Sequence, residues 1–154
     1  MHEQTIAAFA KEIGFKQVSV SSELVPLIKM VPRGQTCVVD AYLSPVLTSY
    51  KNLICKGLTN IPLMFMQSNG GLTDAERFRG KDAILSGPAG GMVGAVKTAN
   101  QNGIDKIISF DMGGTSTDVG LYAGSYLRNF EPEIEGMKLQ VPSLDIHTVA
   151  AGGG

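Results

Sequence analysis

The sequence has no tryptophan, two cysteines and no long apolar run, and each scarcity argues against a class of protein. No segment approaches the ~20 apolar residues of a membrane span. Thirteen basic and fourteen acidic residues give a net charge of −1, without the basic excess of a nucleic-acid-binding surface. The acidic, amphipathic N-terminal stretch is unlike a signal or transit peptide. We therefore expect a cytoplasmic protein, about one domain long, with neither membrane nor nucleic acid as a partner.

The two cysteines are placed where they cannot form a disulfide. Cys37 and Cys55 lie eighteen residues apart in a helix predicted over 36–56, so their Cα atoms are about 27 Å apart. A disulfide requires a separation under roughly 7 Å. Free thiols are typical of a reducing compartment, and the lack of a CxxC pair or Cys/His cluster argues against structural zinc.

Glycine is abundant and unevenly distributed. Sixteen of the nineteen glycines follow position 69. This divides the chain into a mostly helical scaffold, about 1–58, and a sheet with glycine-rich loops, about 59–154. In the first part, apolar spacing predicts helices over 4–13 and 36–56. We expect the apolar stripe of the longer helix to be buried, Leu47 included.

Short apolar runs alternate with helical patterns along the chain. Helices are also predicted from a capping box at 73–76 and from Pro88 to about Asn100. Strands are predicted at 16–21, 61–67 and 106–110 and in VGLYAG, YLRNF, MKLQV and LDIHTV. This order predicts an α/β fold with a mixed sheet and flanking helices.

The strongest candidate site is the segment DMGGTSTD, which follows a predicted buried strand. Ligands of open α/β sheets lie at the carboxyl ends of strands. The glycines allow a tight turn that presents N–H groups to an anion, and the two aspartates suit a hydrated Mg²⁺. The candidate phosphate ligands are Asp111, Gly113, Gly114, Thr115, Ser116, Thr117 and Asp118, with Asp111 and Asp118 also the candidate metal ligands. The alternative is a Gly-Gly hairpin capped by Asx and Ser/Thr side chains.

Two other segments contain candidate ligand-binding residues. The predicted helix that begins at Ser86, Gly87 and Pro88 has free N–H groups for an anion, with Gly90 and Gly91 as further candidate ligands; close helix packing explains these glycines equally well. Asp145 and His147 share one face of a predicted strand. They are either additional metal ligands or a structural hydrogen-bonded pair.

Five motifs occur in a characteristic order: RGQTCVVDAYLSPVL, MQSNGGL, ILSGPAGGMVGA, FDMGGTSTDVGLY and DIHTVAAGGG. From about Glu23 to Gly154 the chain resembles the hydantoinase A/5-oxoprolinase family. The resemblance implies part of an actin-like/ribonuclease H-like ATPase fold, with ATP and Mg²⁺ held between two lobes. DMGGTSTD is similar to the second-lobe phosphate loop of such proteins. The implied activity is ATP-dependent hydrolysis of a cyclic amide, as in N-methylhydantoinase or 5-oxoprolinase.

The sequence departs from that family in length. Family members carry an earlier DxGGTxxD loop, whereas this sequence has one such loop and stops within its terminal glycines. We therefore expect a fragment that acts with the remainder of a parent chain and with a hydantoinase B-type subunit or domain. Alone, it should bind Mg-ATP weakly or not at all and have no ATPase activity. The alternatives are a non-catalytic assembly or regulatory module and a subunit of an ATP-dependent ketone carboxylase. The catalytic residues and the particular amide or ketone remain open.

Overall fold

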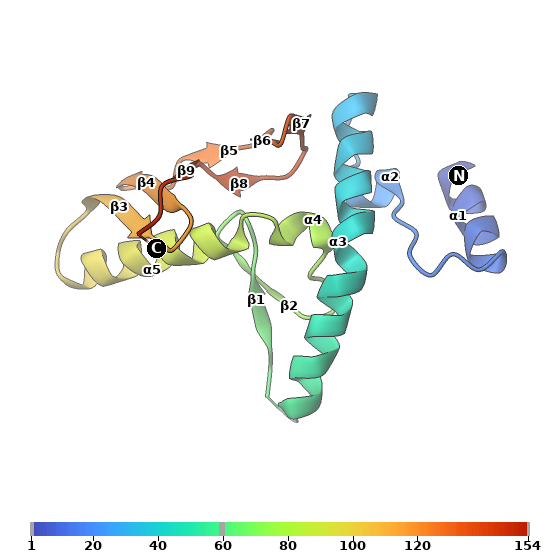
Figure 1. The fold of residues 1–154 in the computed structure, drawn as a ribbon, viewed down its shortest axis with the longest axis horizontal. Helices are drawn as coiled ribbons and strands as arrows, with labels where there is room; N and C mark the ends of the chain where they lie inside the picture. The colour runs from blue at the N-terminus through green and yellow to red at the C-terminus, as the bar shows by residue number, and fades with distance from the viewer. Residues whose placement is uncertain (1, 59–60, 154) are drawn as a thin grey trace.

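A computed structural model describes residues 2–58 and 61–153 of the chain. Figure 1 shows an elongated molecule with α1 (His2–Glu12) at one end and α3 (Met30–Gly57) crossing its middle. At the other end α5 (Ser86–Gln101) lies beside a sheet of β3 (Lys106–Met112), β4 (Thr117–Ala123) and β9 (Ile146–Val149). None of the described helices is both long and apolar enough to cross a membrane.

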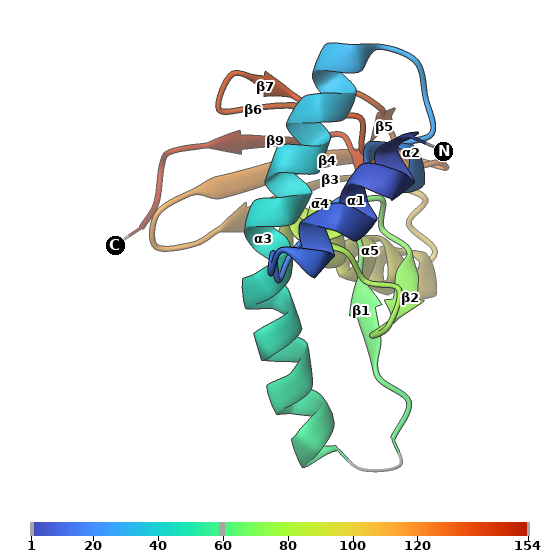
Figure 2. The ribbon, with the colours of Figure 1, turned by 90° about the vertical axis from the view of Figure 1, so that its right-hand side faces the viewer.

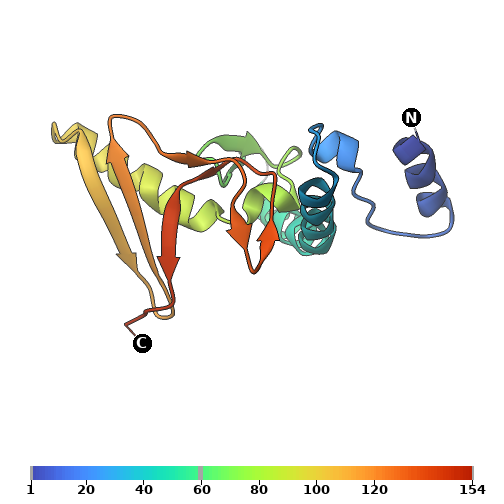
Figure 3. The ribbon, with the colours of Figure 1, turned by 90° about the horizontal axis from the view of Figure 1, so that it is seen from above.

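The three-stranded sheet has the order β3-β4-β9, and both of its pairings are antiparallel. Figure 3 shows α5 running along one face of this sheet. The buried core here comprises Ala89, Met92 and Val96 of α5 together with Leu144, which lies two residues before β9. A Cβ atom added to Gly120 would lie 2.7 Å from Met92 Sδ, so glycine permits this close approach of strand and helix. The sequence places this small residue where α5 crosses β4.

The remaining strands are short and also pair antiparallel. These pairs are β1 (Met64–Met66) with β2 (Leu72–Asp74), β5 (Arg128–Asn129) with β8 (Ser143–Leu144), and β6 (Glu133–Ile134) with β7 (Met137–Lys138). The α/β class and the flanking helices are as predicted. Instead of the predicted mixed sheet, the described residues form four small sheets without a parallel pair. Short loops such as 113–116 permit hairpins, whereas a parallel pair needs a crossover of a dozen or more residues.

Two predicted elements are wrong. Residues 16–21 form no strand: the segment has no strand partner among the described residues and is attached to α3 by Ser19, whose Oγ donates to Asp40 Oδ2 at 2.7 Å. It leads into the short α2 (Ser21–Leu24). The capping box at 73–76 starts no helix, because Thr73 belongs to β2 and pairs there with Phe65 of β1. Asp74 Oδ1 instead accepts from the Arg77 N–H at 3.1 Å in a turn, before the four-residue α4 (Gly80–Ala83).

The apolar stripe of α3 is only partly covered, contrary to expectation. Leu43, Leu47 and Ile54 are half-buried. Tyr42, Val46 and Leu53, beside them on the helix surface, are exposed. The stripe predicted the helix correctly but not its burial, because the elements that contact α3 (α4, α2 and the 137–138 strand) leave one side of it open. Both cysteines lie in α3 and are free, as expected.

A buried polar group connects α3 to its neighbours. Asp40 is 2% exposed; besides the Ser19 hydroxyl it accepts the backbone N–H of Lys81 at 3.0 Å. The Thr36 hydroxyl, also buried, accepts the Gln140 N–H at 2.8 Å. Hydrogen bonds therefore join α3 to segments before and after it in the chain.

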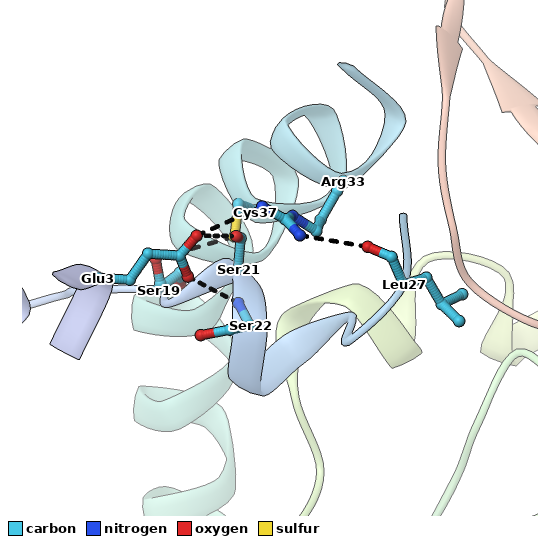
Figure 4. A network of polar contacts seen from close by, with 7 residues as sticks. All are labelled: Glu3, Ser19, Ser21, Ser22, Leu27, Arg33 and Cys37. Carbon is cyan, nitrogen blue, oxygen red and sulfur yellow. Dashed lines mark hydrogen bonds and ion pairs between the residues drawn. The ribbon is translucent and has the colours of Figure 1, made fainter. Parts of the chain in front are cut away.

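The N-terminal helix is attached through Glu3 (Figure 4). Its carboxylate accepts the Ser21 hydroxyl at 2.7 Å and the Ser22 backbone N–H at 2.8 Å, with Arg33 Nη2 at 3.5 Å. The Ser21 and Ser22 hydrogen bonds, helped by the Arg33 charge, lower the pKa of Glu3 from 4.5 to about 2. The ionised carboxylate thus helps to hold α1 against α2 and α3.

Candidate functional site

The hairpin between β3 and β4 is tight and its two aspartates face each other. Gly113 N–H donates to the Ser116 carbonyl at 2.8 Å across the four-residue loop 113–116. Asp111 pairs with Asp118 in the strand register. Directly paired residues of antiparallel strands point to the same face. The hairpin therefore holds two carboxylates side by side on one face of the sheet.

Beneath those carboxylates lies a cavity of about 240 Å³ between the sheet and α5. Its lining comprises Pro88, Gly91, Met92, Ala95, Ser109, Phe110, Asp111, Asp118 and Ile146. A Cβ atom added to Gly91 would be 3.3 Å from Asp111 Oδ2, so the carboxylate lies close to the α5 backbone. The structure thus brings together the DMGGTSTD segment and the first turns of the glycine-rich helix, which the sequence indicated separately.

The other predicted ligands of the hairpin have mixed positions. Thr117 is buried and its hydroxyl donates to the Ala151 carbonyl at 2.5 Å, so it already has a structural partner. Gly113 O accepts the N–H of Gly153 at 3.0 Å, and Gly152 lies against Gly114. Gly114 and Thr115 are exposed at the tip and Ser116 is half-buried. The loop N–H groups and these hydroxyls remain predicted phosphate ligands.

The helix residues predicted with the hairpin do not all reach the cavity. Ser86 Oγ donates to the Ala83 carbonyl at 2.8 Å, and Gly87 is exposed. Gly90 faces Met66 of β1, whose Cγ would lie 3.7 Å from an added Cβ. Leu85, at the N-cap position, makes no side-chain capping hydrogen bond. The cavity therefore lies along α5 at Pro88 and Gly91 rather than at its very tip.

Asp145 and His147 line a different hollow. A groove of about 550 Å³ runs along β9 and is lined by both residues and by Thr115 and Ser116. His147 pairs with Val119, the neighbour of Asp118, so His147 lies on the opposite face of the sheet from the paired aspartates. Asp145 and His147 therefore do not complete a ligand set with Asp111 and Asp118, and their metal-binding role remains a prediction.

Two polar residues beside the cavity were not identified from the sequence. Thr148 Oγ1 donates to Asp118 Oδ1 at 2.6 Å and fixes that carboxylate. Ser109, two residues before Asp111 on the same face of β3, donates to Met92 Sδ at 3.0 Å. The two-residue period of the strand could have indicated Ser109. The pairing of β9 with β4, which brings up Thr148, has no local signal.

The paired aspartates fit a hydrated divalent cation better than a fully protein-coordinated one. In the part of the chain that the structure describes, no three His, Cys, Asp or Glu side chains form a metal-binding group. Mg²⁺ typically keeps several waters and is held by one or two carboxylates together with substrate phosphates. Like charges directly opposite in a sheet repel, and a cation between Asp111 and Asp118 would offset that repulsion. The donor set thus matches Mg²⁺ bound with a polyphosphate.

Comparison with known proteins identifies the family. The model of the hydantoinase/oxoprolinase family matches residues 33–154. The chain belongs to the hydantoinase/oxoprolinase family. It is 51% identical to 5-oxoprolinase 1 of Arabidopsis thaliana and 49% identical to 5-oxoprolinase of Dictyostelium discoideum, in each case over 99% of this chain. The α/β fold superposes on nucleotide-free acetone carboxylase with a TM-score of 0.82 at 25% identity, covering 99% of this chain and 22% of that one. The aligned segment spans only 12% and 13% of the two oxoprolinases.

Proposed function

We propose that this chain supplies a phosphate- and metal-binding hairpin to an ATP-dependent enzyme that opens a cyclic amide, of the hydantoinase or oxoprolinase type. The observation that carries the proposal is the shared cavity of Asp111, Asp118 and the start of α5. The roughly 50% identity to oxoprolinases favours a cyclic amide over a ketone as the compound activated. ATP and Mg²⁺ are the cofactors that this function requires.

In this proposal the chain's residues bind and orient rather than react. Asp111 and Asp118 would hold the hydrated metal ion, and Thr148 keeps Asp118 in place through its 2.6 Å hydrogen bond. Backbone N–H groups of the 113–116 loop would face the phosphate oxygens. The bound Mg²⁺ would neutralise charge on the transferred phosphate. A water-excluding wall and the nucleotide base contacts would come from the longer polypeptide that relatives possess.

A second candidate function has one specific observation in its favour. The fold match to acetone carboxylase is compatible with a subunit that activates a ketone for carboxylation. Both candidates use the same phosphate site and differ in the acceptor. A substrate comparison on the full-length enzyme, 5-oxoproline against acetone, distinguishes them.

The proposal is tested by Asp111→Asn in a full-length enzyme that contains this chain. Removing the metal-directed charge should lower 5-oxoproline-dependent ATP turnover by about 100-fold or more, since electrostatic groups at reacting centres contribute that much. The loss should be greatest at limiting Mg²⁺. Asp105→Asn is the matched control, because it removes the same charge just before β3 and outside the cavity. Wild-type turnover by Asp111→Asn at limiting Mg²⁺ would contradict the assignment.

A further inference from the structure

The long helix α3 has a continuous apolar surface that no described element covers. Val38, Tyr42, Val46 and Leu53 are 65%, 80%, 73% and 72% exposed. Tyr50 lies between the last two and is also exposed. From Val38 to Leu53 the row extends about 22 Å along the helix axis, at 1.5 Å per residue. Scattered exposed apolar residues are ordinary, but a contiguous row of this length marks a contact surface.

The angular extent of the apolar side chains indicates a second packing neighbour. At about 100° per residue, the exposed row covers an arc of about 120°, and the half-buried Leu43, Leu47 and Ile54 lie just beyond its edge. An arc of about 100° suffices for a helix packed on one side. The chain's own elements therefore cover one side of the helix. The remaining apolar arc is wide enough for a second packing neighbour.

The exposed row continues into a hollow on the α4 side. An apolar cavity of about 440 Å³ is lined by Leu43, Val46, Leu47, Tyr50, Ala83 and Ile84. In Figures 1 and 2, the described elements beside the C-terminal half of α3 are the short α4 and the β1–β2 hairpin, both on one side of the helix. Among the charged residues between Val38 and Leu53, Asp40 is buried and Lys51 donates to the Ala75 and Phe78 carbonyls at 2.7 and 3.1 Å. The surface is therefore apolar and uncharged, with a hollow at one side.

We propose that this surface, Val38 to Leu53 with the adjoining cavity, is the docking site for an amphipathic helix from elsewhere in the longer polypeptide. Residues 38, 42, 46 and 50 form an i, i+4 ridge, which packs into the groove of a second helix. Polypeptide to supply that helix exists in the oxoprolinase relatives, of which the aligned segment is 12–13%. The inference rests on the part of the proposed function that places this chain within a longer enzyme, but not on nucleotide binding.

The test compares the 154-residue chain with a longer form that includes the flanking polypeptide. Val38→Ser with Tyr42→Ser changes the exposed row outside the cavity lining, and serine has nearly the helix propensity of the residues it replaces. The double variant should leave the unfolding midpoint of the short chain unchanged and lower that of the long form by several degrees. Amide exchange over 38–53 should be slower by about tenfold or more in the wild-type long form than in the short chain.

Ile54→Ser on the half-buried side, outside the cavity lining, is the matched control and should destabilise both forms. Equal exchange in the two forms, or no effect of the double variant on the long form, would overturn the proposal. A short-chain dimer that sedimentation detects and the double variant dissociates would instead assign the surface to a second copy, which also overturns it. A long form that shows the α3 effects but binds no Mg-ATP would refute the proposed function and leave the docking site standing.

Discussion

The α5–sheet region and the α3 region are stabilised in opposite ways. Between α5 and the sheet the buried side chains are apolar, and Ser109, Asp111 and Asp118 are the polar residues that line the adjoining cavity. Within α3 the two buried side chains, Thr36 and Asp40, are polar, while large apolar side chains of the same helix face outward. The first arrangement is that of a packed core beside the proposed binding site. The second is that of an element whose apolar partner lies elsewhere.

Of the substitutions that test this comparison, Asp40→Ala should lower folding stability the most. Asp40→Ala leaves the Ser19 hydroxyl and the Lys81 N–H without their acceptor in a buried position. Hydrogen bonds to charged groups contribute roughly 1.5–3 kcal/mol each, so we expect a loss of about 3 kcal/mol by denaturant unfolding. Amide exchange should rise in α3 and α4 before it rises in α5. A loss below about 1 kcal/mol would mean that water replaces these bonds.

The α5–sheet contact is broken by Gly120→Ala. The added methyl group would lie 2.7 Å from Met92 Sδ and 2.9 Å from Ser109 Oγ. Overpacking of this kind costs about 1–3 kcal/mol, and exchange should rise in α5 and β4 while α3 is unaffected. Gly124→Ala is not a suitable control because its φ is +85°; Gly94→Ala, with no atom near its added Cβ, is. Equal stability of Gly120→Ala and wild type would show that the Met92 side chain can move away from the added methyl group at no measurable cost in stability.

The smallest expected effect concerns the attachment of α1. Because the folded-state pKa of Glu3 is about 2, below its ordinary 4.5, the stabilisation by its carboxylate is present above about pH 4.5. It is lost as the pH falls toward 2. Glu3→Gln should therefore lower the unfolding midpoint near pH 6 and match wild type near pH 2. Glu12→Gln, the same change at the other end of α1, provides the control. A constant difference across this range would exclude the carboxylate as the cause.

The features that depend on residues close together in the sequence were predicted correctly. The hairpin at 111–118 and the helix beginning near Pro88 follow from turn residues and periodicity. The free state of Cys37 and Cys55 follows from their spacing in one helix. The failures have tertiary causes: 16–21 lacks a strand partner, and Thr73 pairs with Phe65 instead of capping a helix.

The candidate site was predictable as separate pieces but not as an assembly. The sequence indicates Asp111 and Asp118 as ligands and the glycines of α5 as an anion site. Their meeting at one cavity depends on the packing of Met92 against Gly120. For α3, apolar spacing indicates the helix, yet it does not distinguish a face covered within these 154 residues from one that is left open.

The central claim, that the 111–118 hairpin and the start of α5 form one phosphate-and-metal site, is tested most directly by nuclear magnetic resonance with Mn²⁺-ATP. Paramagnetic Mn²⁺ broadens nearby amide signals even when binding is weak, as we expect for this chain alone. The account predicts selective broadening of the amide signals of 111–118 and 89–91 that Asp111→Asn with Asp118→Asn abolishes. Broadening confined to Asp145 and His147, or unchanged in the double variant, would contradict it.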